Sequence, residues 1–273
     1  MKVVLFCGGL GTRLREHSDT IPKPLVPVGH RPILWHLMRY YAHFGHKDFI
    51  LCLGYRGDMI RDYFLNYSEC LSNDFVMSEG GNKIELMSRD LDDWRITFVD
   101  TGQNSNIGMR LMRIRHYLEG EEMFLANYAD GLTDLPMNDR IADFRKTDAV
   151  ASFVAVPTPA SFHGVTADDN GIVTAFGAMS DSMFAVNAGY FCLRQQVFDY
   201  IREGEELVEA PFQRLIEARK LTAAITPRLV TAESIAQAYQ FVATGNAELG
   251  FVALSQLANV KDGSRWMVPQ ALY

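Results

Sequence analysis

A glycine-rich run at residues 6–14, FCGGLGTRL, holds the groups best suited to chemistry. It directly follows a short apolar segment that predicts a buried strand. Glycines at positions 8, 9 and 11 let the backbone approach a phosphate oxygen, because no Cβ intervenes, and successive amides there form an anion-binding nest. Arg13 adds a cation whose planar fork suits phosphate. We therefore expect a phosphate-binding loop, although an ordinary strand-to-helix turn also fits this run taken alone.

A lysine framed by two prolines follows in the segment Ile21–Leu25, which reads IPKPL. Prolines restrict φ and favour extended neighbours. The backbone of Lys23 is therefore held in one conformation, and its ammonium group is directed to one side of the turn. A triphosphate site needs a cation in a fixed position, whereas a lysine that only contacts solvent does not need a proline on each side. Together the two segments favour a site for a nucleotide triphosphate.

Alternating strands and helices are predicted to position these segments. Expected strands cover residues 3–7, 48–53, 95–99, 123–126 and 149–156, and expected helices cover residues 32–44, 59–67, 108–117 and 211–219. This alternation predicts an α/β fold with a Rossmann-like mixed, mainly parallel sheet, and helices on both faces. Residues 165–193 read as shorter antiparallel strands that extend over the sheet, and the helix at 211–219 reads as the last element of this region. Ligands of such sheets bind at the carboxyl ends of the strands.

The composition limits the classes of protein to which this chain can belong. The chain has 273 residues, of which 48% are hydrophobic, enough for one large domain or one domain with an appendage. A net charge of -7 argues against nucleic acid as a partner. Four cysteines without a CxxC pair suggest buried thiols in a reducing cytosol, and no apolar stretch approaches the length of a membrane span. We expect a cytoplasmic protein with no membrane partner, and leave open whether it forms a homo-oligomer.

The pattern GGxGTRL followed by PKPL resembles the signature of the sugar-1-phosphate nucleotidyltransferases. The resemblance continues through residues 32–38, 48–57, 63–67 and 99–102, which look like the CTP-using branch that acts on glucose 1-phosphate. It covers about residues 1–224 in register. The resemblance implies a reaction in which CTP and glucose 1-phosphate give CDP-glucose and pyrophosphate, with Mg²⁺ as the cofactor.

Site residues follow from the same resemblance. It implies that Asp130, in the segment Tyr128–Gly131, holds Mg²⁺ against the triphosphate, while Asp134 reads as a turn or cap residue. The implied catalytic residues are Arg13, Lys23 and Asp130. The implied nucleotide-binding residues are Phe6, Cys7, Gly8, Gly9, Leu10, Gly11, Thr12, Ser105, Arg110 and Ala129. The implied sugar-binding residues are Asn187, Gly189 and Glu209.

Two segments depart from the family pattern. Residues 107–110 read IGMR where the commoner relatives have TGGR, and residues 174–179 lack the lysine of the usual Glu-Lys-Pro segment. These differences concern the choice of base or sugar rather than the reaction type. An enzyme of the same fold that uses UTP, dTTP or another hexose 1-phosphate therefore stays open.

The last part of the chain resembles a different family. Residues 225–273 are similar to a fragment of the periplasmic molybdate-binding proteins, so we divide the chain into a nucleotidyltransferase domain, 1–224, and a small α/β C-terminal appendage, 225–273. The appendage lacks the aspartate that serves as the family's second Mg²⁺ ligand. Two further alternatives follow: a sugar-nucleotide binder with impaired catalysis, and a protein that binds molybdate or another oxyanion through its tail.

Overall fold

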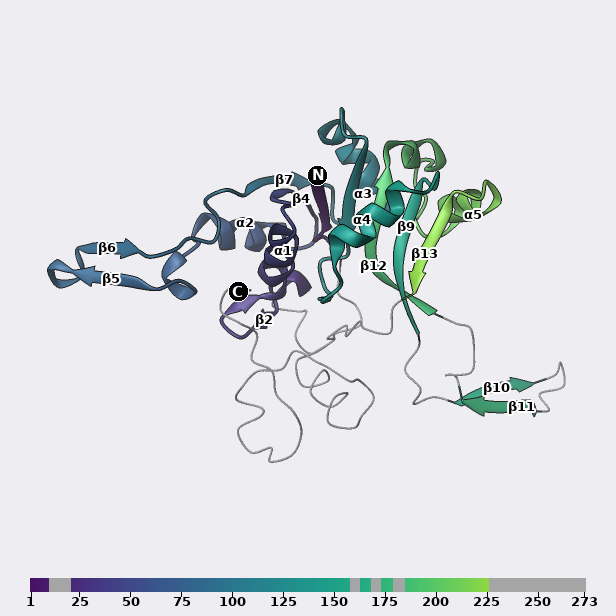
Figure 1. Cartoon of the computed structure of the whole chain (residues 1–273), viewed down its shortest axis with the longest axis horizontal. Helices are drawn as coiled ribbons and strands as arrows, with labels where there is room; N and C mark the ends of the chain where they lie inside the picture. Colours follow the sequence, from purple (N-terminus) through teal and green to yellow (C-terminus); the bar gives the residue numbers. More distant parts are fainter. Residues whose placement is uncertain (10–20, 158–162, 168–172, 179–184, 226–273) are drawn as a thin grey trace.

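A seven-stranded sheet forms the centre of the computed structural model, which describes residues 1–9, 21–157, 163–167, 173–178 and 185–225 (Figure 1). The strand order is β13-β9-β12-β8-β1-β4-β7. β12 runs antiparallel to β8 and β9, and the other neighbours pair in parallel. The strands are β1 (Lys2–Phe6), β4 (Asp48–Leu53), β7 (Arg95–Asp100), β8 (Met123–Asn127), β9 (Ala151–Pro157), β12 (Ala185–Arg194) and β13 (Leu221–Ile225). The expected mixed, mainly parallel sheet is confirmed.

Helices cover both faces of this sheet because its central strands are apolar on both sides. In β1, Val3 and Leu5 face one core, whereas Val4 and Phe6 face the other. The first core is closed by α1 (Ile33–His43), α2 (Gly57–Leu65) and α4 (Met137–Arg145). The second is closed by α3 (Ile107–Ile114), α5 (Ala210–Glu217) and the 3₁₀ turns η4 (Arg115–Leu118) and η6 (Gln195–Tyr200). Continuous apolar runs are typical of strands that are buried on both faces. No helix in the described ranges has the length and apolar character needed to span a membrane.

The structure differs from the sequence prediction in two places. β10 (His163–Ala167) and β11 (Val173–Ala178) form a two-stranded sheet of their own, whereas β12 enters the main sheet. The prediction that the helix near 211–219 is the last element was wrong, because β13 follows it and pairs in parallel with β9. β13 reads LTAAI, a weak strand pattern, so pairing with its neighbour rather than local propensity decides its conformation.

The segment between α2 and β7 contains a hairpin that sequence analysis did not predict. β5 (Phe75–Ser78) and β6 (Lys83–Leu86) pair with each other and project away from the main sheet (Figure 1). The remaining short elements are β2 (Pro27–Val28), β3 (Arg31–Pro32) and the 3₁₀ turns η1 (Lys23–Leu25), η2 (Glu69–Leu71) and η3 (Glu79–Gly81).

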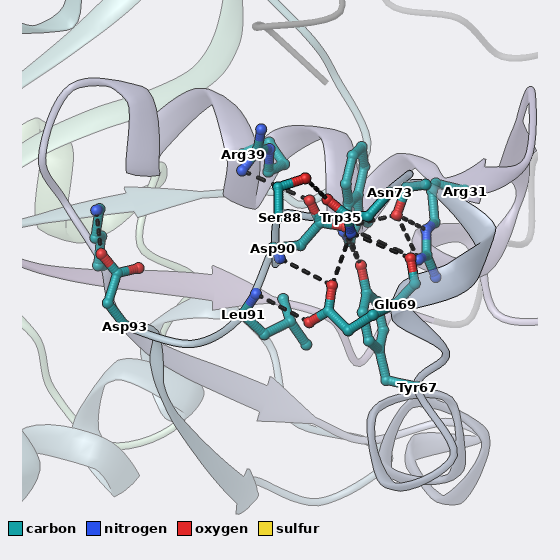
Figure 2. Close-up of polar contacts among 12 residues, drawn as sticks. Arg31, Trp35, Arg39, Tyr67, Glu69, Asn73, Ser88, Asp90, Leu91 and Asp93 are labelled. Carbon is teal, nitrogen blue, oxygen red and sulfur yellow. Dashed lines mark hydrogen bonds and ion pairs between the residues drawn. The ribbon is translucent and has the colours of Figure 1, made fainter. Parts of the chain in front are cut away.

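A buried carboxylate, Asp90, joins the base of this hairpin to α1 (Figure 2). It accepts hydrogen bonds from the hydroxyls of Tyr67 (2.7 Å) and Ser72 (2.5 Å). Its oxygens also lie 3.9 Å from Nη2 of Arg31 and 3.8 Å from Nη1 of Arg39. Arg31 and Asp90 are only 1% and 4% exposed. Burial at this level makes the pair sensitive to the loss of either partner.

We expect Asp90→Ala to lower the free energy of unfolding by about 3–5 kcal/mol, because the Arg31 charge would stay buried without its counter-ion. Urea unfolding measures this loss. The matched control is Asp93→Ala, which breaks an exposed ion pair with Lys47 and should cost less than about 1 kcal/mol. Equal losses of unfolding free energy in the two variants would contradict a stabilising role of the buried Asp90–Arg31 pair.

Candidate active site

Five chain segments meet at the edge of the sheet where the parallel strands end. Cys7–Gly9 follows β1, Gly54 follows β4, the Thr101–Ser105 turn follows β7 and the Tyr128–Gly131 turn follows β8. β12 runs in the opposite direction, so its beginning, with Asn187–Gly189, lies at the same edge. The carboxyl edge of a parallel sheet is where ligands of such folds bind.

Lys23 and Asp130 come together at this edge, although 107 positions separate them in the sequence. Nζ of Lys23 donates to Oδ2 of Asp130 at 2.7 Å, and each side chain is about 30% exposed. Pro22 is extended, with φ -66° and ψ 143°, and Pro24 is buried, so the chain around Lys23 is held in place. The two charges are therefore adjacent and both reachable by a ligand.

The turn that carries Asp130 is fixed by hydrogen bonds on both sides. Ala129 adopts the left-handed conformation, with φ 62°, and its N–H donates to Oδ1 of the buried Asn127 at 2.8 Å. On the other side, the hydroxyl of Tyr190 donates to the carbonyl of Gly131 at 2.8 Å. Burial raises the pKa of Tyr190 well above its usual range, so this donor keeps its proton. These contacts present the Asp130 carboxylate in one position. Sequence analysis assigned no role to Asn127 or Tyr190.

Asn187 lies beside the same turn and contacts Tyr128. Its Nδ2 donates to the Tyr128 hydroxyl at 3.2 Å, and its Oδ1 accepts from the N–H of Gly189 at 2.9 Å. Gly189 has φ 77°, and a Cβ there would meet the Tyr128 ring at 2.2 Å, so only glycine fits. Glu209 is exposed at the N-cap of α5, a helix that packs in the second core. The structure thus links Asn187 and Gly189 to the Asp130 turn, and places Glu209 apart from these contacts.

Arg110 lies beneath the glycine-rich run and holds three strand ends together. It is 2% exposed, and its guanidinium donates to the carbonyls of Gly8 (2.9 Å) and Leu53 (2.9 Å) and to Oγ1 of Thr101 (2.6 Å). These acceptors are neutral, so the buried charge adds positive potential below the loop. Burial also lowers the pKa of Arg110. Arg110 supports the loop from inside.

Ser105 is buried as well, and its hydroxyl donates to the carbonyl of Thr101. Arg113 donates to the same carbonyl. Thr101 is fully buried and its hydroxyl donates to the Leu53 carbonyl at 2.7 Å. Thr101 therefore joins β4 to the turn after β7, a role that its place in the family-like segment 99–102 did not reveal.

We expect Gly8→Ala to destabilise the protein by about 1–3 kcal/mol, because the new Cβ would lie 2.2 Å from Nη1 of Arg110, which is buried and held by three hydrogen bonds. Thermal unfolding measures the loss. Gly9→Ala is the matched control, since a Cβ at Gly9 meets nothing within 4 Å. If Gly8→Ala were as stable as Gly9→Ala, the close packing of Arg110 against the loop would be wrong.

The remaining predicted positions divide into two groups. Phe6, Cys7 and Ala129 are buried, and their side chains serve the core. Burial raises the pKa of the Cys7 thiol well above its usual range and that of Cys52 to about 12, so neither is a nucleophile. Leu10, Gly11, Thr12 and Arg13 lie outside the described residues, so their predicted nucleotide contacts stay predictions.

Comparison with known proteins identifies the family. The nucleotidyl transferase family model matches residues 2–244. Glucose-1-phosphate cytidylyltransferase of Salmonella typhi is 39% identical over 209 residues, which cover 74% of this chain and 78% of the relative. A solved structure of UDP-glucose pyrophosphorylase complexed with UDP-glucose shares the fold, with a TM-score of 0.60 at 14% identity, over 86% of this chain and 94% of the other.

A second similarity concerns a short stretch. Molybdate-binding protein ModA of Rhodobacter capsulatus is 61% identical over 49 residues, which are 18% of this chain and 19% of the relative. This match confirms the resemblance seen in the sequence, while the division into domains at residue 224 stays a prediction. The chain belongs to the nucleotidyl transferase family and is a sugar-1-phosphate nucleotidyltransferase.

Proposed function

We propose that the chain transfers the cytidylyl group of CTP to glucose 1-phosphate, forming CDP-glucose and pyrophosphate. The observation that supports this most is the 2.7 Å contact of Lys23 with Asp130 at the edge where the glycine-rich run begins. A cation for the phosphates and a carboxylate for a metal stand side by side there. The choice of CTP and glucose 1-phosphate comes from the relative that is named for them.

In this reaction an oxygen of the sugar phosphate attacks the α-phosphorus of CTP, and the bond from that phosphorus to the bridging oxygen breaks. Pyrophosphate leaves, and no covalent bond to the protein forms. Lys23 would neutralise charge on the phosphates, together with Arg13, and the amides of Gly8, Gly9 and Gly11 would cradle the nucleotide. Ser105 and Arg110, which are buried, would support the nucleotide side from beneath, and Asn187, Gly189 and Glu209 would serve the sugar side. Positioning and charge supply most of the catalysis in such phosphoryl chemistry.

The divalent metal of this family fits the site through Asp130. Mg²⁺ prefers one or two carboxylates, with phosphate oxygens and water as its other ligands. The part of the chain that the structure describes has no group of three or more acidic, histidine or cysteine side chains able to enclose a metal. Asp130 would therefore share the ion with the phosphates of the nucleotide. When bound, Mg²⁺ would screen the repulsion between the two anionic substrates.

The proposal places the reaction in the cytoplasm. All four cysteines are free, and three of them are buried, as expected in a reducing compartment.

A matrix of nucleotides against sugar phosphates tests the proposed substrates. CTP, UTP and dTTP would each be combined with glucose 1-phosphate and with other hexose 1-phosphates, and the rate of pyrophosphate release measured over a range of Mg²⁺ concentrations. We expect the highest kcat/KM for CTP with glucose 1-phosphate, because a site that pairs the amino group of cytosine leaves its partner unsatisfied with uracil. We also expect a raised Mg²⁺ requirement, since the sequence offers one family carboxylate instead of two. Equal rates with the three nucleotides would refute the assignment of CTP.

A further inference from the structure

Glu206 is a carboxylate outside the predicted site residues, and its two oxygens bind two different segments of the chain. Its Oε2 accepts from the backbone N–H of Ile107, the first residue of α3, at 3.1 Å. Its Oε1 accepts from the backbone N–H of Leu207 at 2.9 Å. The first amides of a helix have no partner within the helix, and Glu206 satisfies one of them. One side chain thus ties the start of α3 to the turn at residues 204–207, which precedes α5.

Two further contacts join the same segments. Nδ2 of Asn106 donates to the carbonyl of Gly204 at 2.9 Å, while its Oδ1 accepts from the N–H of Met109 at 2.9 Å. Gly108 lies directly against the turn, because a Cβ there would meet the carbonyl oxygen of Glu205 at 2.1 Å. The first turn of α3 therefore rests on the turn at 204–207 through two side-chain links and one close backbone contact.

The start of α3 belongs to the nucleotide side of the proposed site. Ser105 comes two residues before Ile107, and Arg110 comes three residues after it. The buried guanidinium of Arg110 donates to the carbonyl of Gly8, at the beginning of the glycine-rich run. A displacement of the first turn of α3 would therefore move the groups that support the nucleotide.

Glu206 also lies near the turn that carries Asp130. Burial raises the pKa of the Tyr128 hydroxyl, and the negative charge of Glu206 raises it further. The same hydroxyl accepts from Nδ2 of Asn187 at 3.2 Å. Glu206 is thus close to both the nucleotide side and the sugar side of the site.

We propose that Glu206 is a positioning residue for nucleotidyl transfer, which holds the start of α3, and with it Ser105 and Arg110, in the place that binds CTP. This inference rests on the proposed function. Glutamate suits the role because both carboxylate oxygens accept hydrogen bonds, whereas a side-chain amide has one acceptor oxygen and one donor nitrogen. Glu206→Gln would set that nitrogen against one of the two backbone N–H groups and release the contact.

Steady-state kinetics of Glu206→Gln in the intact chain test this role. We expect the KM for CTP to rise about 5- to 30-fold, as expected for the loss of a hydrogen bond to a charged group. The kcat and the KM for glucose 1-phosphate should stay within about three-fold, since an interaction that binds the ground state and the transition state alike affects only the KM of its substrate. The matched control is Glu203→Gln, which removes the same charge at an exposed position of the neighbouring chain and should keep the KM for CTP.

Gly108→Ala tests the same contact from the other segment. Its Cβ would press the carbonyl of Glu205 away from α3, so the KM for CTP should rise in this variant as well. Hydrogen exchange of the amides of residues 107–110 tests the positioning without any substrate. These amides should exchange faster in Glu206→Gln than in the unaltered chain or in Glu203→Gln.

An unchanged KM for CTP in Glu206→Gln would overturn the inference, even if the variant were less stable or had a lower kcat. Unchanged exchange at residues 107–110 would overturn it as well. An unaltered chain that forms no CDP-glucose would instead refute the proposed function, and the exchange rates would still decide whether Glu206 holds the start of α3.

Discussion

Asp130→Asn should lower the rate of nucleotidyl transfer by roughly 10²–10³-fold or more while CTP still binds. The substitution keeps the size of the side chain and removes its charge, so the proposed metal loses the carboxylate that contacts Lys23. Charge that develops on the α-phosphate in the transition state then loses part of its screening, which affects turnover more than binding. Pyrophosphate release measures the rate, and calorimetry with CTP measures the binding.

Asp134→Asn is the matched control, since Asp134 lies on the same connection and is exposed. It should leave the rate within about two-fold, as expected for an exposed position that is not among the proposed site residues. If the two variants had equal rates, or if Asp130→Asn abolished CTP binding while preserving turnover per bound nucleotide, the role given to Asp130 would be wrong.

Lys23→Ala should change two affinities in opposite directions. CTP binding should weaken by roughly 10- to 150-fold, because loss of a charge-assisted phosphate contact costs about 1.5–3 kcal/mol. Binding of a divalent metal to the nucleotide-free protein should become tighter, because Lys23 donates directly to Asp130 and competes with a metal for that carboxylate. Calorimetry with CTP and paramagnetic resonance of free Mn²⁺ measure the two effects separately.

Lys47→Ala serves as the comparison, since Lys47 pairs with Asp93 at an exposed position away from the site. It should leave both affinities unchanged. Unaltered CTP affinity in Lys23→Ala would remove this lysine from the phosphate site. Unaltered Mn²⁺ affinity would show that the contact with Asp130 does not limit metal binding in the free protein.

Much of the fold was predictable because its signals are local. Strand β4 was predicted with its observed bounds, and α1 differs from the prediction by one residue at each end. Short apolar runs ended by glycine mark buried strands in any context. β13 lacked such a signal, since LTAAI is a weak strand pattern, and its pairing with β9 determines its conformation. The β5–β6 hairpin carried one, Gly80 and Gly81 between two short runs, which sequence analysis did not use.

The residues of the candidate site were predictable from the sequence, but their contacts with one another were not. Residue types and spacing marked Lys23 and Asp130 separately, but their direct contact depends on how β8 and the proline-framed turn are placed in space. Arg110 illustrates the opposite case. Its family-like position suggested a nucleotide contact, whereas its buried guanidinium donates to Gly8, Leu53 and Thr101. A long side chain reaches several acceptors, and only the packing around it selects among them.

The most direct test of the account is to look for its product. The intact chain would be incubated with CTP, glucose 1-phosphate and Mg²⁺, with the Asp130→Asn variant as the blank, and the products identified by mass spectrometry and phosphorus NMR. The account predicts CDP-glucose and pyrophosphate in equal amounts, formed by the unaltered chain far faster than by the variant. CTP that binds to the chain without any CDP-glucose above the blank would contradict it, and would make the protein a nucleotide binder rather than a transferase.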